Sequence, residues 1–442
     1  MGGHRDVMKG KWTVLAFLCG VFVLYTVDRA LLGILAIPIQ KETGLNDVQF
    51  GVLSSAIFWT YALVVPFAGL AGDRFDRAKL IGLAVIAWSL MTFLAGFAGG
   101  FWSLFLLVSF AIVVPQTVYS PTAHALIASL HKETRTVAMS CHQAAYYTGW
   151  FVSGAAVAGI LALFGTWRAA FFVCGGLGLL VGLVFLLFAA RMAPGSPAAI
   201  EQSNNPNNRT IEQSNDRTIE QSEQSNNPNN RTIKQSLRAF WGCPSALLAG
   251  LAYVAEVFVG FGYSAWGPKF VAVKFGISPG AAGTGVMFWH YAASFAAILV
   301  TGVVTDRLVR KHPRFRLVLS MAAMAVCIPA LVLFGFADLL PVVWLAAALF
   351  GVMRGVFGAN QFTNVFDVVP AANRAAALGF LNVVAGLVGS LAPILIGWLS
   401  HTRGVRGFEI GFAAMGAIQV VAIGTLLWSY LFTFERNRLK EG

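Results

Sequence analysis

The stretch GLAGDRFDRAK at residues 69–79 recurs as GVVTDRLVRK at residues 302–311, and both follow the pattern G-x-x-x-D-R-x-x-R. Each copy follows a long apolar run that is the second of its half of the chain. An Asp at a helix end beside Arg residues can hold neighbouring helix ends together through charge-assisted hydrogen bonds. An ordinary basic loop explains one such motif, but two copies at equivalent places predict two related halves.

The composition is that of a chain that lies mostly in lipid. Of its 442 residues, 57% are hydrophobic and 11% are charged, and the mean hydropathy is +0.71. Soluble domains carry about 25% charged residues, so we predict an all-α membrane protein. A transmembrane helix needs about 20 mainly apolar residues. Such runs predict twelve spans, at residues 12–38, 49–71, 78–98, 101–130, 134–164, 167–189, 244–275, 280–305, 315–336, 340–369, 373–399 and 408–432.

The positions of Lys and Arg indicate how these spans are oriented. Cytoplasmic loops carry an excess of both residues, and most of them fall on the cytoplasmic side when the N-terminus is placed inside. Both termini are therefore predicted to be cytoplasmic, in a multi-pass protein of a plasma membrane such as the bacterial inner membrane. The net charge of +12 thus reflects topology, and we expect no nucleic-acid partner.

The composition changes abruptly between the sixth and seventh spans. Residues 200–236 form a polar repeat that begins IEQSNNPNNRT and has almost nothing to bury; segments of this kind stay disordered. A passive linker is favoured over the alternative, a ligand-binding repeat. We expect an N-terminal six-helix bundle at residues 1–190, a cytoplasmic linker at 191–240 and a C-terminal six-helix bundle at 241–442.

Twelve spans, a central linker and the paired loops together resemble the major facilitator superfamily over essentially the whole chain. The resemblance implies a carrier in which one half rocks against the other around a substrate near the membrane midplane. It also implies that charged residues of the paired loops control this movement without touching substrate. These residues are Asp73, Arg74, Arg77, Asp306, Arg307 and Arg310. The first loop departs from the family pattern in having Asp76 where Gly is usual.

Within this superfamily, the first 80 residues resemble the anion:cation symporters. Their opening helix carries Y-x-x-D-R or similar, here Tyr25, Asp28 and Arg29, and SAWGPKF at 264–270 is similar to their W-x-P motif. Members typically take up sugar acids and other organic carboxylates, often with protons. The same opening, with the stretch at 118–135, also resembles the Spinster-like lipid transporters, which are the second choice.

The fourth span departs from both of these families. Their fourth helix commonly carries an Arg followed seven residues later by a Glu. Pro121 fixes the register here and places Ser109 and Gln116 at those two positions. A binding cation and a proton carrier are both missing, so proton coupling through this span is not implied by the resemblance.

Four ionisable residues lie deep within predicted spans, where such side chains are costly and usually mark a functional site. Arg binds a carboxylate through a bidentate fork, so Arg29 and Arg354 are candidates for holding an anion. A proton carrier needs a buried carboxyl group with a shifted pKa, which makes Asp28 and Glu256 candidates for proton coupling. Structural pairing is the alternative for each of them. Adjacent helix residues do not face each other, so Asp28 and Arg29 are expected to contact different neighbours.

Uncharged polar and aromatic side chains in the spans are further candidates. In an apolar helix such groups contact a substrate or bridge to a neighbouring helix. Besides Arg29 and Arg354, we assign to substrate binding Tyr25, Tyr61, His142, Gln143, Tyr146, Asn360, Gln361, Asn364 and Trp266. We also expect Trp266 and Pro268 to break span seven.

The sequence contains no motif of an ATP-driven pump, hydrolase or metalloprotease, and no Cys or His spacing that predicts a metal site. We therefore expect no catalytic residues, no metal and no cofactor. The prediction is a monomeric secondary transporter of a small organic anion, a carboxylate or sugar acid, in symport with H⁺ or alternatively Na⁺. A Spinster-like transporter of lysophospholipid or sphingolipid is the alternative within the fold. A non-transporting membrane receptor or scaffold is the alternative of another class.

Overall fold

The computed structural model describes residues 2–131, 133–192, 240–309 and 311–439, although not every side chain within them. In this part of the chain, twelve helical segments are long and apolar enough to cross a membrane. The predicted all-helical membrane fold is confirmed. The predicted linker at 191–240 lies almost wholly outside the described residues, and the domain boundaries stay predictions.

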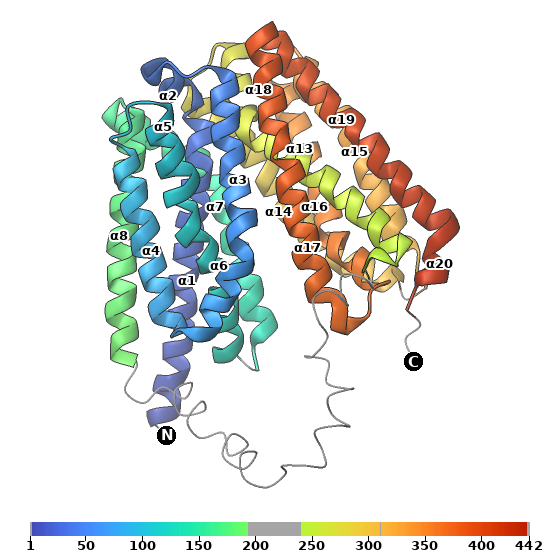
Figure 1. Ribbon diagram of the computed structural model, residues 1–442, viewed down its shortest axis with the longest axis horizontal. Helices are drawn as coiled ribbons and strands as arrows, with labels where there is room; N and C mark the ends of the chain where they lie inside the picture. Colours follow the sequence, from blue (N-terminus) through green and yellow to red (C-terminus); the bar gives the residue numbers. More distant parts are fainter. Residues whose placement is uncertain (1, 132, 193–239, 310, 440–442) are drawn as a thin grey trace.

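The helices form two bundles, one from each half of the chain (Figure 1). The first bundle contains α1 (Gly2–Ile34), α2 (Ala36–Thr43), α3 (Asp47–Arg74), α4 (Arg77–Ala95), α5 (Phe101–Leu104), the π-helix η1 (Phe105–Ala111), α6 (Val113–Leu130), α7 (Arg135–Phe164) and α8 (Trp167–Met192). The second contains α13 (Pro244–Phe275), α14 (Pro279–Val309), α15 (Phe315–Phe336), α16 (Leu340–Phe366), α17 (Ala371–Gly389), α18 (Leu391–Arg403), α19 (Val405–Trp428), the π-helix η3 (Ser429–Thr433) and α20 (Phe434–Asn437).

Helix breaks in the first and seventh spans differ from what the sequence predicts, as does a break in the eleventh span between α17 and α18. The first span is predicted to reach residue 38, but α1 ends at Ile34 and a separate short helix, α2, follows. The predicted break of span seven at Pro268 is wrong, because α13 continues through this residue. A proline inside a membrane helix is tolerated where neighbouring helices stabilise the interrupted backbone. Here the Trp266 indole Nε1 donates to the Pro393 carbonyl of α18 over 2.8 Å and ties α13 to its neighbour.

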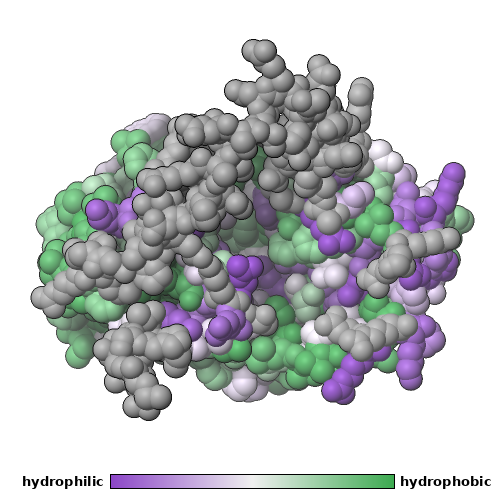
Figure 2. Space-filling model, turned by 90° about the horizontal axis from the view of Figure 1, so that it is seen from below, coloured by the Kyte–Doolittle hydropathy of each residue, from purple (hydrophilic) through white to green (hydrophobic). Residues whose placement is uncertain are grey.

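The two bundles meet at the end formed by α2 and α18 and lie apart at the end where α1 begins and α20 lies (Figure 1). Seen from the latter end, the surface recedes between the two halves (Figure 2). At the closed end α1 approaches α13 so tightly that a Cβ atom on Gly33 would lie 2.6 Å from the Ser264 carbonyl oxygen. A glycine is needed at such a contact because any side chain would push the helices apart.

A polar cluster around Asp47 crosses from one half to the other at the closed end. The Asp47 carboxylate, at the first residue of α3, pairs with Lys269 of α13 and accepts a hydrogen bond from Ser400 of α18. Gln40 of α2 donates to the same carboxylate over 2.8 Å and accepts from the Lys269 ammonium over 2.6 Å. The Lys269 and Asp47 side chains are only 13% and 15% exposed, so this ion pair is largely shielded from water. We name these four residues the outer latch, because the predicted orientation, with both termini cytoplasmic, places this end outside.

An Asp47→Asn substitution is expected to shift the equilibrium toward the opposite open state. Removing one partner of a shielded ion pair leaves the other uncompensated, and a loss of about 1–2 kcal/mol changes an equilibrium constant about 5- to 30-fold. Spin labels on the facing ends of α3 and α18 should therefore report longer distances at this end.

A Glu42→Gln variant is the matched control for this measurement. Glu42 lies at the same end, but it pairs with Arg168 of its own half at 2.8 Å. Hydrogen bonds from Arg168 and Trp167 hold the pKa of the Glu42 carboxyl below its usual range, so it is an ionised partner as Asp47 is. Equal shifts in both variants would show that the outer latch does not hold the halves together.

Candidate functional site

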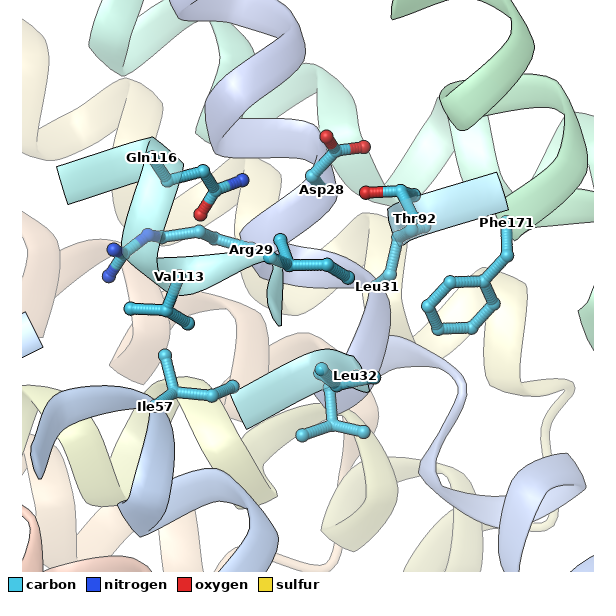
Figure 3. A pocket seen from close by; sticks show the side chains of 11 residues that line it. Asp28, Arg29, Leu31, Leu32, Ile57, Thr92, Val113, Gln116 and Phe171 are labelled. Carbon is cyan, nitrogen blue, oxygen red and sulfur yellow. The ribbon is translucent and has the colours of Figure 1, made fainter. Parts of the chain in front are cut away.

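Asp28 and Arg29 lie next to each other near the C-terminal end of α1, and their side chains leave the helix in different directions (Figure 3). Asp28 points toward Thr92 of α4, whereas the Arg29 guanidinium extends past Gln116 of α6 (Figure 3). The expectation that the two side chains contact different neighbours is met. Both line one small cavity of about 20 Å³, room for a single water molecule.

The Arg29 guanidinium is held between aromatic rings. Its Cζ lies 4.9 Å from the centre of the Tyr25 ring and 5.4 Å from that of Tyr61, distances at which a cation is attracted to the face of a ring. Within the described part of the chain, Arg29 Nε and Nη2 have no hydrogen-bond partner. Two donors of a planar fork are therefore free to bind an anion.

The carboxyl group of Asp28 has a different environment. No close hydrogen bond reaches either of its oxygens among the described residues, although the Trp88 indole on the facing helix α4 lies near enough to interact with the carboxyl group. The Thr92 hydroxyl on the same helix also has no hydrogen-bond partner there. A buried charge without such partners is costly. The group is placed where gain or loss of a proton would change the local electrostatics strongly.

A second charged pair lies in the other half and joins two predicted candidates. Arg354 Nε of α16 lies 3.1 Å from Glu256 Oε1 of α13, and Gln419 of α19 donates to the other Glu256 oxygen over 3.3 Å. A Cβ atom on Gly260, one turn from Glu256, would lie 2.7 Å from the Arg354 Cζ, so glycine makes room for the guanidinium. Arg354 Nη1 has no hydrogen-bond partner in the described residues.

Tyr146 of α7 connects the surroundings of the two arginines. Its ring lies 5.2 Å from Phe22 of α1 and 6.4 Å from Trp150, and it interacts electrostatically with Arg354. Trp150 in turn stacks on Tyr291 of α14 at 4.9 Å. The structure thus places Tyr25, Tyr61 and Tyr146 near the arginines, and their role in substrate binding stays a prediction.

Several other predicted residues are engaged elsewhere. His142 is buried, stacks on Phe22 and has its Nε2 3.0 Å from the Tyr119 hydroxyl, which itself donates to the Leu18 carbonyl. Gln143 lies on an open depression that also includes His124 and Arg135. These contacts of His142 and Gln143 include neither of the two arginines.

The polar residues of α16 are mostly directed to their own half. Asn360 donates to the Val356 carbonyl of its own helix and Asn364 donates to Ser320 of α15, and both are buried. Gln361 is half-buried. Trp266, besides its bond to α18, packs on Phe50 of α3 with ring centres 5.4 Å apart, so it lies at the closed junction of the halves.

The paired loops are described only in part. Arg77 begins α4 and Arg307 is exposed near the end of α14. Arg310 and the side chains of Asp73, Arg74 and Asp306 lie outside the described residues. Asp76, which departs from the family pattern, accepts from the Lys79 backbone N–H over 2.8 Å and caps the N-terminus of α4.

Sequence reasoning misses the outer latch and part of the aromatic surroundings. Asp47 and Ser400 are far apart in the chain, and no local motif links them. Tyr253 and Tyr291 are also missed. The sequence offers one signal for them: the chain has only nine tyrosines, so each tyrosine within a span is conspicuous. Ser109 is explained by packing: its hydroxyl donates to the Leu53 carbonyl of α3 over 3.1 Å.

Comparison with known proteins adds three kinds of similarity. The family model of the Major Facilitator Superfamily matches residues 17–393. The chain is 24% identical to the hexuronate transporter of Bacillus subtilis, covering 94% of this chain and 93% of that protein. It is 26% identical to the cis,cis-muconate transport protein of Acinetobacter baylyi, covering 91% of each. A bacterial homologue of the human lysosomal transporter Spinster, crystallised inward-facing and unoccupied, superposes with a TM-score of 0.79 at 19% identity and covers 98% of this chain and 99% of that one.

Proposed function

This chain belongs to the major facilitator superfamily, and from that premise we propose that it carries a small organic anion across the membrane together with a proton. Membership makes the protein a transporter and not an enzyme. The observation that carries the proposal is the pair of arginines, Arg29 from one half and Arg354 from the other, with guanidinium donors that have no partner in the described residues. The planar fork of a guanidinium group matches the two oxygens of an organic carboxylate.

The full-length relatives support an anion as the substrate class. Hexuronate and cis,cis-muconate, which two of them carry by name, differ in hydroxylation and unsaturation but share the carboxylate. A carboxylate held by arginines from both halves would be exposed alternately to either side as the halves rock. In this proposal the guanidinium groups bind the anion, and the relative movement of the two halves carries it across the membrane.

Asp28 is the coupling residue that this proposal requires. Protonation removes a charge that no close hydrogen bond stabilises in the described structure, and a proton needs no coordination shell. A Na⁺ ion is less well suited, because hard cations take several oxygen ligands. The cavity of about 20 Å³ beside Asp28 includes one carboxylate, with Thr92 and Gln116 as its uncharged polar lining.

The experiment that tests the proposal is uptake of organic anions into proteoliposomes under an imposed pH gradient. An outside-acid gradient should drive accumulation, whereas a Na⁺ gradient should not. A protein that exchanges no anion of any kind under either gradient would leave the proposal without support. Uptake of lysophospholipid instead would point to the lipid-carrying alternative.

An Asp28→Asn variant should separate coupling from binding. Because Asn carries no titratable proton, accumulation driven by the pH gradient should fall at least about tenfold, while exchange of labelled for unlabelled anion without a gradient should stay within about threefold. Thr92→Val, on the same cavity, is the matched control and should retain gradient-driven uptake. Normal accumulation by the Asp28→Asn variant would show that another group carries the proton.

A further inference from the structure

We infer that the anion is planar, with conjugated double bonds or an aromatic ring beside its carboxylate, rather than a polyhydroxylated sugar acid. This inference rests on the proposed anion transport and narrows its substrate class. It comes from the kind of side chains that lie between the two arginines.

Phenol rings dominate this region. Seven of the nine tyrosines lie near one arginine, near the other, or near Tyr146 between them, and they come from both halves. They are Tyr25, Tyr61, Tyr146, Tyr147, Tyr253, Tyr263 and Tyr291. Four of them, at positions 61, 146, 147 and 253, are half-buried, so part of each ring surface is not covered by the protein.

Three of these tyrosines, with Phe22 and Trp150, form a continuous aromatic path across the two halves; Tyr146 is its half-buried member and the other rings are buried. Starting beside Arg29, ring centres are 5.6 Å apart from Tyr25 to Phe22 and 5.2 Å from Phe22 to Tyr146. The path continues over 6.4 Å to Trp150 and 4.9 Å to Tyr291 in the other half. A second cross-half contact stacks Phe58 of α3 on Phe261 of α13.

Several amide groups that a sugar acid would need already have a partner. Hydroxyl-rich ligands are recognised by side chains that both donate and accept hydrogen bonds, and an unmatched hydroxyl is costly to bury. Four amide side chains within the spans make one hydrogen bond each in the described structure: Asn360 with Val356, Asn364 with Ser320, Asn382 with Tyr253 and Gln419 with Glu256. Asn364 Oδ1 and Gln419 Oε1 have no partner in the described residues, but both belong to buried side chains. Gln116 keeps a free Nε2 beside Arg29, where it suits the carboxylate end of the ligand.

A planar acid matches both parts of this arrangement. Its carboxylate can bind the free donors of Arg29, and its π-bonded body can lie against the tyrosine rings in offset or edge-to-face geometry. Ring-on-ring contacts favour flat, unsaturated groups over puckered, hydrated ones. The site therefore selects by the shape and polarity of the body that carries the carboxylate.

The test compares anions matched in carbon skeleton and charge. Terephthalate is paired with trans-cyclohexane-1,4-dicarboxylate, and adipate is compared with its 2,4-diene and its tetrahydroxy derivative; benzoate, cyclohexanecarboxylate and quinate, a tetrahydroxycyclohexanecarboxylate, form the monoacid series. Thermal stabilisation of the purified full-length protein measures binding, and exchange in proteoliposomes measures transport of the diacids. The planar member of each series should bind at least about tenfold more tightly than its saturated or hydroxylated analogue.

Variants of Tyr146 test whether the rings supply this preference. Tyr146→Leu should reduce the preference to about threefold or less, whereas Tyr146→Phe keeps the ring and should retain it. Hydroxylated acids that bind as well as planar ones in the unaltered protein would overturn the inference and leave anion transport standing. Binding and exchange of none of these anions would instead reject the proposed function itself.

Discussion

An Arg29→Ala variant is expected to take up organic anions at least about thirtyfold more slowly than the unaltered protein. Arg29 has unpartnered guanidinium donors in a region shielded from water, where losing one partner of a buried charge pair costs about 2–5 kcal/mol. The neighbouring Tyr25 and Tyr61 rings are uncharged and cannot replace it. Initial rates of labelled uptake over a range of substrate concentrations measure the loss.

Two further variants show whether the loss comes from the fork or from charge alone. Arg29→Lys keeps the charge but not the bidentate geometry, so about a tenfold loss is expected. Arg168→Ala is the control, because Arg168 is also an arginine over an aromatic ring of the first half, 4.5 Å from the Trp167 ring, but pairs with Glu42 at the closed end. It should keep uptake within about threefold. Near-normal uptake by Arg29→Ala would remove Arg29 from the binding site.

The fold could be predicted largely from the sequence because burial in the membrane requires local patterns of apolar residues. Each span needs a run of about 20 apolar residues, and the repeated loops at 69–79 and 302–311 mark equivalent places in the two halves. The positions of the helix breaks, by contrast, do not follow from local sequence patterns. Pro268 is incorporated into α13, whereas the eleventh span is interrupted near Ser390, since packing against neighbouring helices decides which break is tolerated.

The charged residues of the candidate site could be predicted from the sequence, but their interaction partners could not. Asp28, Arg29, Glu256 and Arg354 are conspicuous because ionisable side chains are rare at this depth. Whether Glu256 pairs with an arginine depends on how α13 and α16 cross, which no local pattern encodes. The outer latch is hidden for the same reason: Asp47 is an ordinary residue at a helix start until Lys269 and Ser400 are brought to it.

Variants of the Glu256–Arg354 pair distinguish a structural role of these two residues from a role in binding the anion. Arg354→Met should lower stability by about 3–5 kcal/mol, because it leaves Glu256 as an uncompensated buried charge; the Glu256 side chain is only 5% exposed. Replacing both residues with Met should restore much of this loss, since an apolar pair of similar volume often equals a buried ion pair in stability. Thermal unfolding of the purified variants measures both effects.

Transport by the stable double variant then decides the role of Arg354. If Arg354 contacts the anion through its free Nη1, the Arg354→Met/Glu256→Met protein should fold but exchange labelled for unlabelled anion, without a pH gradient, at least about thirtyfold more slowly, as expected for about 2 kcal/mol or more of lost charge-assisted binding. Exchange close to that of the unaltered protein would assign the pair a purely structural role and leave Arg29 as the sole anion anchor of the proposal. Gln419→Leu, which removes only the third member of the cluster, controls for disturbed packing around Glu256 and should retain most of the exchange.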